Sequence, residues 1–165
     1  MSSDNAVLED LARAYVAEAV RALGERVRGA LLFDSVARGE ANRRSDIDLL
    51  IVATGLAPSR LRRSRDIDFI DELLEPRLAP MRALGWHVEI NALWRTPEEA
   101  ARLTPLYFDL TEDAVLLLDR DQLLARTLAE MRRRMAMLGS KRERIGAAYV
   151  WRLKPDIVRG EDFAL

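Results

Sequence analysis

The spacing of hydrophobic residues predicts alternating helices and strands in the first part of the chain. Apolar side chains recur at helical intervals over about Asp4–Leu23, and Gly24 is a natural end for that helix. Two short apolar runs, Val27–Phe33 and Ile47–Val52, are typical of buried strands. The polar segment 34–45 between them contains small residues and a glycine, which favours a turn with room for a single helical turn.

The same kind of spacing predicts the elements of the remaining chain. A helical period returns over 59–84, where Pro76 and Pro80 are expected to kink or split the helix. The elements expected after it are a strand over Trp86–Trp94, a short helix capped at Thr96, a brief strand over Val115–Leu118, an amphipathic helix over Asp121–Leu138 and a short strand near Tyr149–Leu153.

Helices that alternate with short apolar strands predict an α/β (α+β) fold, in which a small mixed sheet is flanked by helices. The chain of 165 residues has no internal repeat, low-complexity segment or long linker, so we expect a single domain over 1–165. Its core is expected at about 25–120, followed by a C-terminal helix and tail at about 121–165. No apolar run is long enough to cross a membrane and no signal peptide is recognisable, which predicts a cytoplasmic protein without a membrane partner.

The composition excludes several kinds of site. The chain has no cysteine and one histidine, His87, which excludes disulfide scaffolds, cysteine nucleophiles and metal sites built from thiolates or several imidazoles. The formal net charge is −1, from 26 basic and 27 acidic residues, so a nucleic acid partner is open but not favoured. The basic runs near 60–65, 132–134 and 141–144 are interpreted as solvated side chains on or beside helices.

Two aspartates open the second apolar strand. Alternate residues of a strand point to the same side, so the carboxylates of Asp46 and Asp48 should project together, with Cα atoms about 7 Å apart. Such a pair suits Mg²⁺, which prefers oxygen ligands, or two such ions in phosphoryl transfer. The alternative is a surface turn with two solvated aspartates. A second Asp-x-Asp, at Asp66 and Asp68, lies in a helical segment where the side chains diverge, so we assign it to a solvated face.

The third predicted strand carries a further carboxylate. Alternation places His87, Glu89 and Asn91 on one face of this strand, opposite an apolar face. A glutamate between Val88 and Ile90 is costly unless it is exposed, paired or bound to a metal. If the third strand lies beside the second, Glu89 supplies a third carboxylate. An edge strand with a solvated face is the alternative.

The polar turn between the first two strands is a candidate phosphate contact. A buried strand that breaks into a turn of small residues can present backbone N–H groups and the Ser35 hydroxyl to a triphosphate. Arg38, which precedes Gly39, would add positive charge there. Most turns of this composition bind no phosphate, so this segment indicates a phosphate site only in combination with the strands and carboxylates beside it.

The order of these pieces resembles the DNA polymerase β-type nucleotidyltransferase superfamily. A strand is followed by Ser35, ten residues, the Asp46–Asp48 triplet, an apolar strand and a later strand glutamate. The short length is similar to the minimal nucleotidyltransferases of prokaryotes. The resemblance is strong over Val27–Val52 and looser over Val88–Asn91.

This resemblance implies a Mg²⁺-dependent enzyme that moves a nucleoside monophosphate from an NTP, with ATP expected, to a hydroxyl and releases pyrophosphate. Asp46 and Asp48 would hold Mg²⁺ and the phosphates, and Glu89 would be the third acidic ligand and help to activate the acceptor hydroxyl. The nucleotide-binding residues that it implies are Ser35, Arg38, Gly39 and Ser45. The acceptor would be a partner protein, such as a toxin encoded alongside, within a homo- or hetero-oligomer.

One residue departs from the family pattern. The family has glycine immediately before the serine, whereas this chain has Asp34. Its negative charge would lie near the expected triphosphate, where like charges about 4 Å apart cost on the order of 1–4 kcal/mol. A second hypothesis is therefore a catalytically weakened homologue that acts as a partner-binding antitoxin module. A third is an antibiotic or tRNA nucleotidyltransferase, for which the sequence offers no separate acceptor domain.

Overall fold

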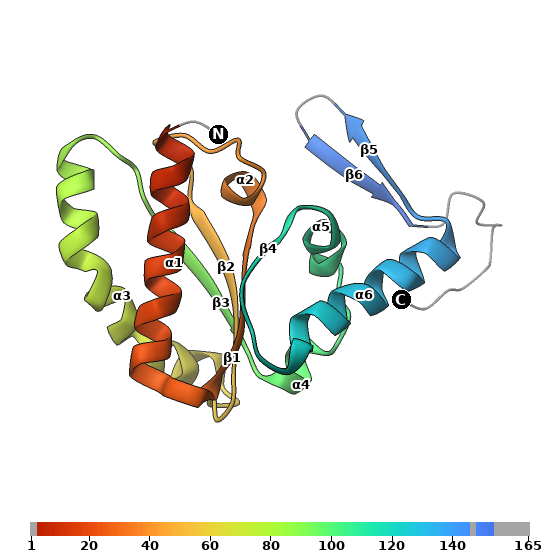
Figure 1. Cartoon of the computed structure of the whole chain (residues 1–165), viewed down its shortest axis with the longest axis horizontal. Coiled ribbons are helices and arrows are strands. Elements are labelled where there is room, and N and C mark those ends of the chain that lie inside the picture. The colour runs from red at the N-terminus through yellow and green to blue at the C-terminus, as the bar shows by residue number, and fades with distance from the viewer. Residues whose placement is uncertain (1–2, 146–147, 154–165) are drawn as a thin grey trace.

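The computed structural model describes residues 3–145 and 148–153, and its centre is a four-stranded sheet (Figure 1). The strands lie in the order β3-β2-β1-β4. β1 pairs antiparallel with both β2 and β4, whereas β2 and β3 are parallel. The prediction of a small mixed sheet is therefore confirmed. The bounds are β1 Val27–Phe33, β2 Ile47–Ala53, β3 Ile90–Arg95 and β4 Val115–Asp119.

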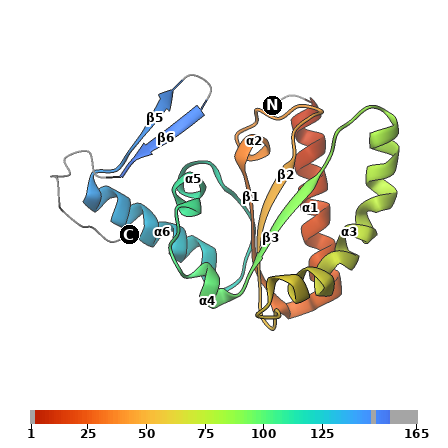
Figure 2. The same cartoon turned by 180° about the vertical axis from the view of Figure 1, so that it is seen from behind.

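Helices cover both faces of this sheet (Figures 1 and 2). On one face α1 and α3 pack against alternate strand residues such as Leu32 and Leu49, and on the other α5 and α6 pack against Leu31 and Leu50. Because both faces are buried, the central strands are apolar throughout. The helices are α1 Ser3–Leu23, α2 Asp34–Ala37, α3 Arg60–Ala83, α4 Pro97–Ala100, α5 Leu106–Asp113 and α6 Leu123–Leu138, with 3-10 turns at Gly24–Arg26 and Arg120–Gln122. Within the described residues no helix has the length and apolarity needed to span a bilayer.

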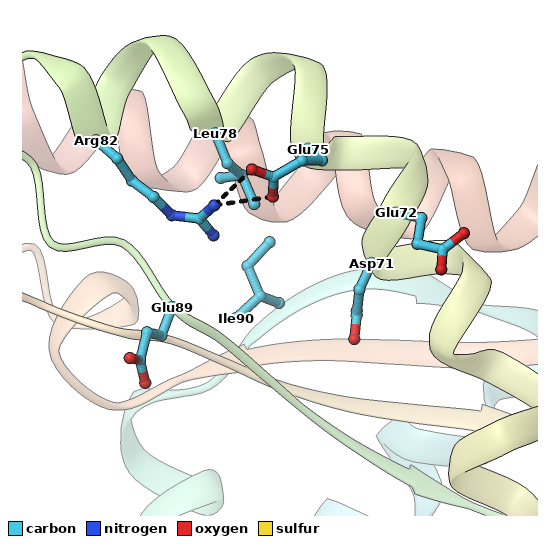
Figure 3. A pocket seen from close by; sticks show the side chains of 7 residues that line it. All are labelled: Asp71, Glu72, Glu75, Leu78, Arg82, Glu89 and Ile90. Atoms are coloured by element: carbon cyan, nitrogen blue, oxygen red, sulfur yellow. Dashed lines mark hydrogen bonds and ion pairs between the residues drawn. The ribbon is translucent and has the colours of Figure 1, made fainter.

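The long helix α3 continues through its two prolines. Figure 3 shows the helix bending between Glu72 and Glu75, just before Pro76. A proline ring clashes with the carbonyl four residues earlier, which here belongs to Glu72. The prolines therefore kink the helix without splitting it. Asp66 and Asp68 are exposed on α3, as predicted.

The strand β3 is shorter than predicted. A strand over Trp86–Trp94 is wrong at its start, since β3 begins at Ile90. The N–H of Trp86 bonds to the last turns of α3 (3.1 Å), and the N–H of His87 bonds to the loop before β2 (2.8 Å). These hydrogen bonds hold the segment outside the sheet, although Val88 is buried on the expected apolar side.

The C-terminal part departs most from the prediction. The helix expected from Asp121 begins two residues later, because Asp121 and Gln122 have left-handed φ angles of 56° and 55°. The basic run at 141–144 follows α6 in β5, Lys141–Ile145, and its Arg142 is paired with Asp113 rather than solvated. β5 pairs with β6, Ala148–Arg152, in a second sheet, and β6 confirms the strand expected near Tyr149–Leu153. The hairpin extends away from the main body (Figure 1). The remaining predicted tail, 154–165, lies outside the described residues.

Candidate active site

Two carboxylates and one amide converge where β2 and β3 begin. Asp46 precedes β2 and Asp48 is its second residue. The parallel pairing of the strands places Asn91 of β3 opposite Asp48. Asn91 Nδ2 lies 3.3 Å from Asp48 Oδ1 and 3.5 Å from Asp46 Oδ2, and it donates to both. Asp46 and Asp48, here called the carboxylate pair, are thus held together from the neighbouring strand.

The turn after β1 lies beside the carboxylate pair. Phe33, the last residue of β1, is the register partner of Asp48, so α2 starts next to the pair. Ser35 is half-buried in this single helical turn. Gly39 closes the turn with a φ of 74°, a left-handed conformation that glycine adopts without steric cost. The predicted phosphate-contact segment and the carboxylate pair are therefore neighbours in the fold.

Ser45, the other residue implied to bind nucleotide, lies in the loop before β2. Its Oγ accepts a hydrogen bond from the N–H of Asn42 (3.1 Å), and its own N–H donates to the carbonyl of Asn42 (3.0 Å). Ser45 therefore helps to shape the loop that leads into the carboxylate pair. Direct contact between Ser45 and a nucleotide stays a prediction.

Asp34 adopts a backbone conformation that favours glycine. Its φ is 61°, in the left-handed region, so the position where the resembled family has glycine retains a glycine-like geometry. The guanidinium of Arg38 lies 2.7 Å from Asp34 and 2.9 Å from Glu40. Asp113 of α5 is a third carboxylate beside it, at 3.6 Å. A triphosphate that recruits Arg38 must therefore compete with three carboxylates.

Negative charge accumulates around Asp48. Burial raises the pKa of the Asp48 carboxyl, the hydrogen bond from Asn91 opposes that rise, and the charges of Asp34 and Asp46 add to it. A perturbed carboxyl among like charges is a common property of functional sites. A cation placed between these groups would relieve their repulsion.

Glu89 lies just before β3 and next to the carboxylate pair in the strand register. Its carbonyl accepts a hydrogen bond from the N–H of Ile47 (2.9 Å), the residue between the two aspartates. Its side chain is 65% exposed and lies 3.9 Å from His87, which is also exposed. Among the residues that the structure describes, no three acidic or histidine side chains are grouped closely enough to hold a metal ion. The carboxylate pair is joined by Asn91 instead, and a role for Glu89 stays a prediction.

The sequence of this site matches a known family. The model of the nucleotidyltransferase domain matches residues 14–111, a span that contains the carboxylate pair, Asn91 and the turn after β1. The chain belongs to the nucleotidyltransferase domain family. It is therefore a nucleotidyltransferase. A comparison with curated proteins found no match.

Solved structures similar to this nucleotidyltransferase include chains of toxin–antitoxin complexes. One, from a toxin–antitoxin with AMP-PNP, is 17% identical, covers 77% of this chain and 92% of its own, and has a TM-score of 0.46. A second, from a complex of tri-AMPylated Shewanella oneidensis HEPN toxin with MNT antitoxin, is 16% identical over 79% and 92%, with a TM-score of 0.42. A third, from MntA–HepT, is 15% identical over the same shares, with a TM-score of 0.42. At these identities the similarity concerns the fold alone.

The carboxylate pair of this nucleotidyltransferase fits a divalent cation. Mg²⁺ at nucleotide sites is bound through one or two carboxylates, while waters and substrate phosphates fill the other positions. Asp46 and Asp48 both approach one Asn91 amide, so their oxygens are close together, and Asp34 adds a further negative charge. Two hard oxygen ligands are therefore available side by side at the start of β2.

Replacing Asp34 by glycine is expected to strengthen nucleotide binding roughly tenfold, because it removes a negative charge near the phosphates. It also removes a side chain from a left-handed position and leaves Arg38 with one carboxylate fewer. Calorimetry with a non-hydrolysable ATP analogue and Mg²⁺ measures the change. Asp34→Asn, which removes the charge alone, serves as the matched variant. Equal affinities in all three proteins would place Asp34 outside the reach of the nucleotide.

Proposed function

We propose that this nucleotidyltransferase requires Mg²⁺ and transfers a nucleoside monophosphate from an NTP, with ATP the expected donor, to a hydroxyl of a partner protein. The observation that carries the proposal is the convergence of Asp46 and Asp48 on Asn91, beside the turn that holds Ser35. Aligned carboxylates next to a phosphate-binding turn are the parts that phosphoryl-type transfer needs, since catalysis there rests on positioning and charge neutralisation.

Different residues would bind the metal ion, bind the phosphates and accept the proton. Asp46 and Asp48 would hold Mg²⁺, which when bound supplies positive charge to the triphosphate. Ser35 and its turn would bind phosphate oxygens and align the α-phosphorus with the acceptor. The acceptor oxygen forms a bond to the α-phosphorus, the bond from that phosphorus to the bridging oxygen breaks, and pyrophosphate leaves. Glu89 would accept the proton of the acceptor hydroxyl.

Glu89→Gln is expected to lower the rate of transfer about 10²-fold while leaving nucleotide affinity unchanged, because a positioned general base contributes on that order. Glutamine keeps the size of the side chain and removes its ability to accept a proton. The measurement is a pH–rate profile of transfer alongside calorimetric nucleotide binding. A transfer rate equal to that of the unchanged protein would exclude Glu89 from proton transfer.

The acceptor that we propose is a toxin encoded beside this chain, with modification of a hydroxyl side chain on it. The support is the resemblance of Val27–Val52 to the minimal nucleotidyltransferases. A second candidate function is favoured by the turn after β1, where Asp34 stands in a left-handed position and Arg38 is paired with carboxylates. On that account the chain binds the toxin without transferring nucleotide.

The experiment that separates these functions uses ATP labelled at the α-phosphorus. The full chain is incubated with labelled ATP, Mg²⁺ and the co-purified product of the neighbouring gene, and label on the partner and released pyrophosphate are both measured. Equal amounts of label and pyrophosphate support transfer. A partner that binds but stays unlabelled, in the presence of Mg²⁺ and ATP, supports the binding module and contradicts the enzymatic proposal.

A further inference from the structure

The outer edge of β3 carries backbone groups that have no hydrogen-bond partner among the described residues. β3 is the last strand on its side of the sheet. The N–H of Ile47 bonds to the carbonyl of Glu89, so Glu89 and every second residue after it face β2. The N–H and C=O groups of Ile90, Ala92 and Trp94 therefore point outward.

Only one of these outward residues has a hydrogen-bonded group in the described part of the chain. The carbonyl of Trp94 accepts from Arg63 Nη1 at 3.0 Å, which confirms the outward direction. The N–H and C=O groups of Ile90 and Ala92 have no partner among the described residues. An unpaired strand edge is a template for another strand, and proteins usually cover it.

A groove follows this edge, between β3 and α3. Near the start of β3 it is lined by Asp71, Glu72, Glu75 and Leu78 of α3 and by Glu89 and Ile90 (Figure 3). Further along, a second hollow is lined by Arg63 and Ile67 of α3, by Ala92, Trp94 and Arg95 of β3, and by Glu99. Both hollows lie between the same two elements. We call the two together the β3 groove.

The start of the β3 groove is strongly acidic. Four carboxylates line it, and the cation among its lining residues, Arg82, is already paired with Glu75 at 2.7 Å. Glu72 makes no ion pair with any described residue. Figure 3 shows Asp71 and Glu72 on α3 at one end of the hollow and Glu89 at the other end, with their carboxylates separate from the Arg82–Glu75 pair. The surplus of negative charge fits a basic occupant.

The start of the β3 groove adjoins the candidate active site at Glu89. Glu89 lines the groove through its side chain, and through its carbonyl it bonds to the residue between Asp46 and Asp48. Asn91, one residue into β3, donates to both members of the carboxylate pair. A segment lying along β3 would therefore run to the site where transfer takes place.

We propose that the β3 groove binds an extended basic segment of the acceptor protein, which pairs with the free edge of β3. This inference rests on the proposed function and identifies how the acceptor is recognised. The backbone of the segment bonds to Ile90 and Ala92, as in other cases of strand addition. Its lysine or arginine side chains lie against Asp71, Glu72 and Glu75, and its hydroxyl residue lies beside Glu89. Main-chain pairing supplies affinity, and the carboxylates of Asp71, Glu72 and Glu75 supply selectivity for a basic segment.

Short fluorescent peptides test the proposal directly. One peptide has a central tyrosine flanked by arginines at alternate positions, and its matched partner has glutamates in their place. Fluorescence anisotropy is expected to show binding of the arginine peptide at least about tenfold tighter than of the glutamate peptide, and weaker binding at high salt. Equal affinities would overturn the proposal that the acidic residues of the β3 groove select a basic segment.

Variants separate backbone pairing from charge. Ala92→Pro removes an outward N–H that β2 does not use, so the arginine peptide should bind about tenfold more weakly, while Ala92→Val should bind as before. Methylation of alternate peptide amides gives the same test without altering the protein. Glu72→Lys should weaken binding, whereas Asp66→Lys, on α3 outside the groove, should not. Binding that survives both Ala92→Pro and amide methylation contradicts strand addition.

Transfer measurements separate this inference from the proposed function. If labelled nucleotide reaches the partner protein at the same rate with Glu72→Lys and Ala92→Pro as with the unchanged chain, the groove is not the acceptor site and the enzymatic proposal stands. If the arginine peptide binds in the groove but no label is transferred to any acceptor, the binding surface stands and the enzymatic proposal fails. Slower transfer with unchanged nucleotide affinity in both variants supports the inference.

Discussion

Asp48→Asn is expected to lower nucleotidyl transfer by about 10²–10³-fold, comparable to losing one stabilising group from a charged transition state. Asparagine keeps the shape of the side chain at the start of β2 and removes the charge that would hold the cation. The assay is transfer of α-labelled ATP at saturating Mg²⁺. Asp66→Asn is the matched control, since Asp66 belongs to the exposed Asp-x-Asp of α3 and should leave the rate unchanged.

The same substitution is expected to stabilise the fold near neutral pH. The pKa of Asp48 is raised by burial, with Asp34 and Asp46 adding to the rise. A carboxyl whose pKa is higher in the folded state than in the unfolded state destabilises the fold when it is charged, so the gain from Asp48→Asn should disappear as the pH falls below the unfolded value of about 4. Loss of activity together with a gain in stability would indicate that the charge of Asp48 serves catalysis at the expense of stability. An Asp48→Asn protein that is both fully active and no more stable would exclude such a role.

Arg63→Met is expected to reduce the free energy of unfolding by about 2–3 kcal/mol, between the values for a surface and a fully buried ion pair, because Arg63 is buried while the Glu99 side chain is 35% exposed. The Arg63 side chain is only 8% exposed and pairs with Glu99 through two nitrogens, at 2.7 and 3.0 Å. It also donates to the carbonyls of Ala57 and Trp94. One guanidinium thus joins the start of α3, the end of β3 and the start of α4.

Urea unfolding followed by circular dichroism measures this loss, with Arg62→Met, an exposed neighbour on the same helix, as the control. A decrease below about 1 kcal/mol would mean that the pair is no stronger than a surface ion pair. The pH dependence gives a second check. Arg63 is the main reason that the pKa of Glu99 falls from 4.5 to about 2. This stabilisation is present above the unfolded pKa and is lost as the pH falls toward 2, so the difference between Arg63→Met and the unchanged protein should shrink over that range.

The sequence predicts the features of the site that depend on a single strand. The two aspartates share a side of β2 because of the two-residue period of a strand, and the apolar runs identify β1 and β2 because both faces of these strands are buried. The capping box at Thr96 and the start of α4 at Pro97 are equally local, and both are confirmed.

Features that depend on distant contacts could not be predicted in this way. Trp86 and His87 continue the strand-like pattern, yet hydrogen bonds to remote carbonyls keep them out of β3. Alternation along the strand predicts the correct face for Asn91. Only the parallel register of β2 and β3 shows that Asn91, and not Glu89, contacts both aspartates. The left-handed φ of Asp34 leaves no pattern in the sequence, and Asp113, the third carboxylate beside Arg38, comes from α5, far away along the chain.

The central claim is that Asp46 and Asp48 hold a cation together with a nucleotide, and calorimetric binding of a non-hydrolysable ATP analogue tests it most directly. With Mg²⁺ the unchanged chain should bind the analogue, and chelation of the metal should weaken binding at least about tenfold. The double variant Asp46→Asn/Asp48→Asn should bind equally weakly with and without Mg²⁺, while Asp66→Asn/Asp68→Asn should behave as the unchanged chain. Nucleotide binding that is indifferent to Mg²⁺, or that the Asp46→Asn/Asp48→Asn variant retains in full, would contradict this account.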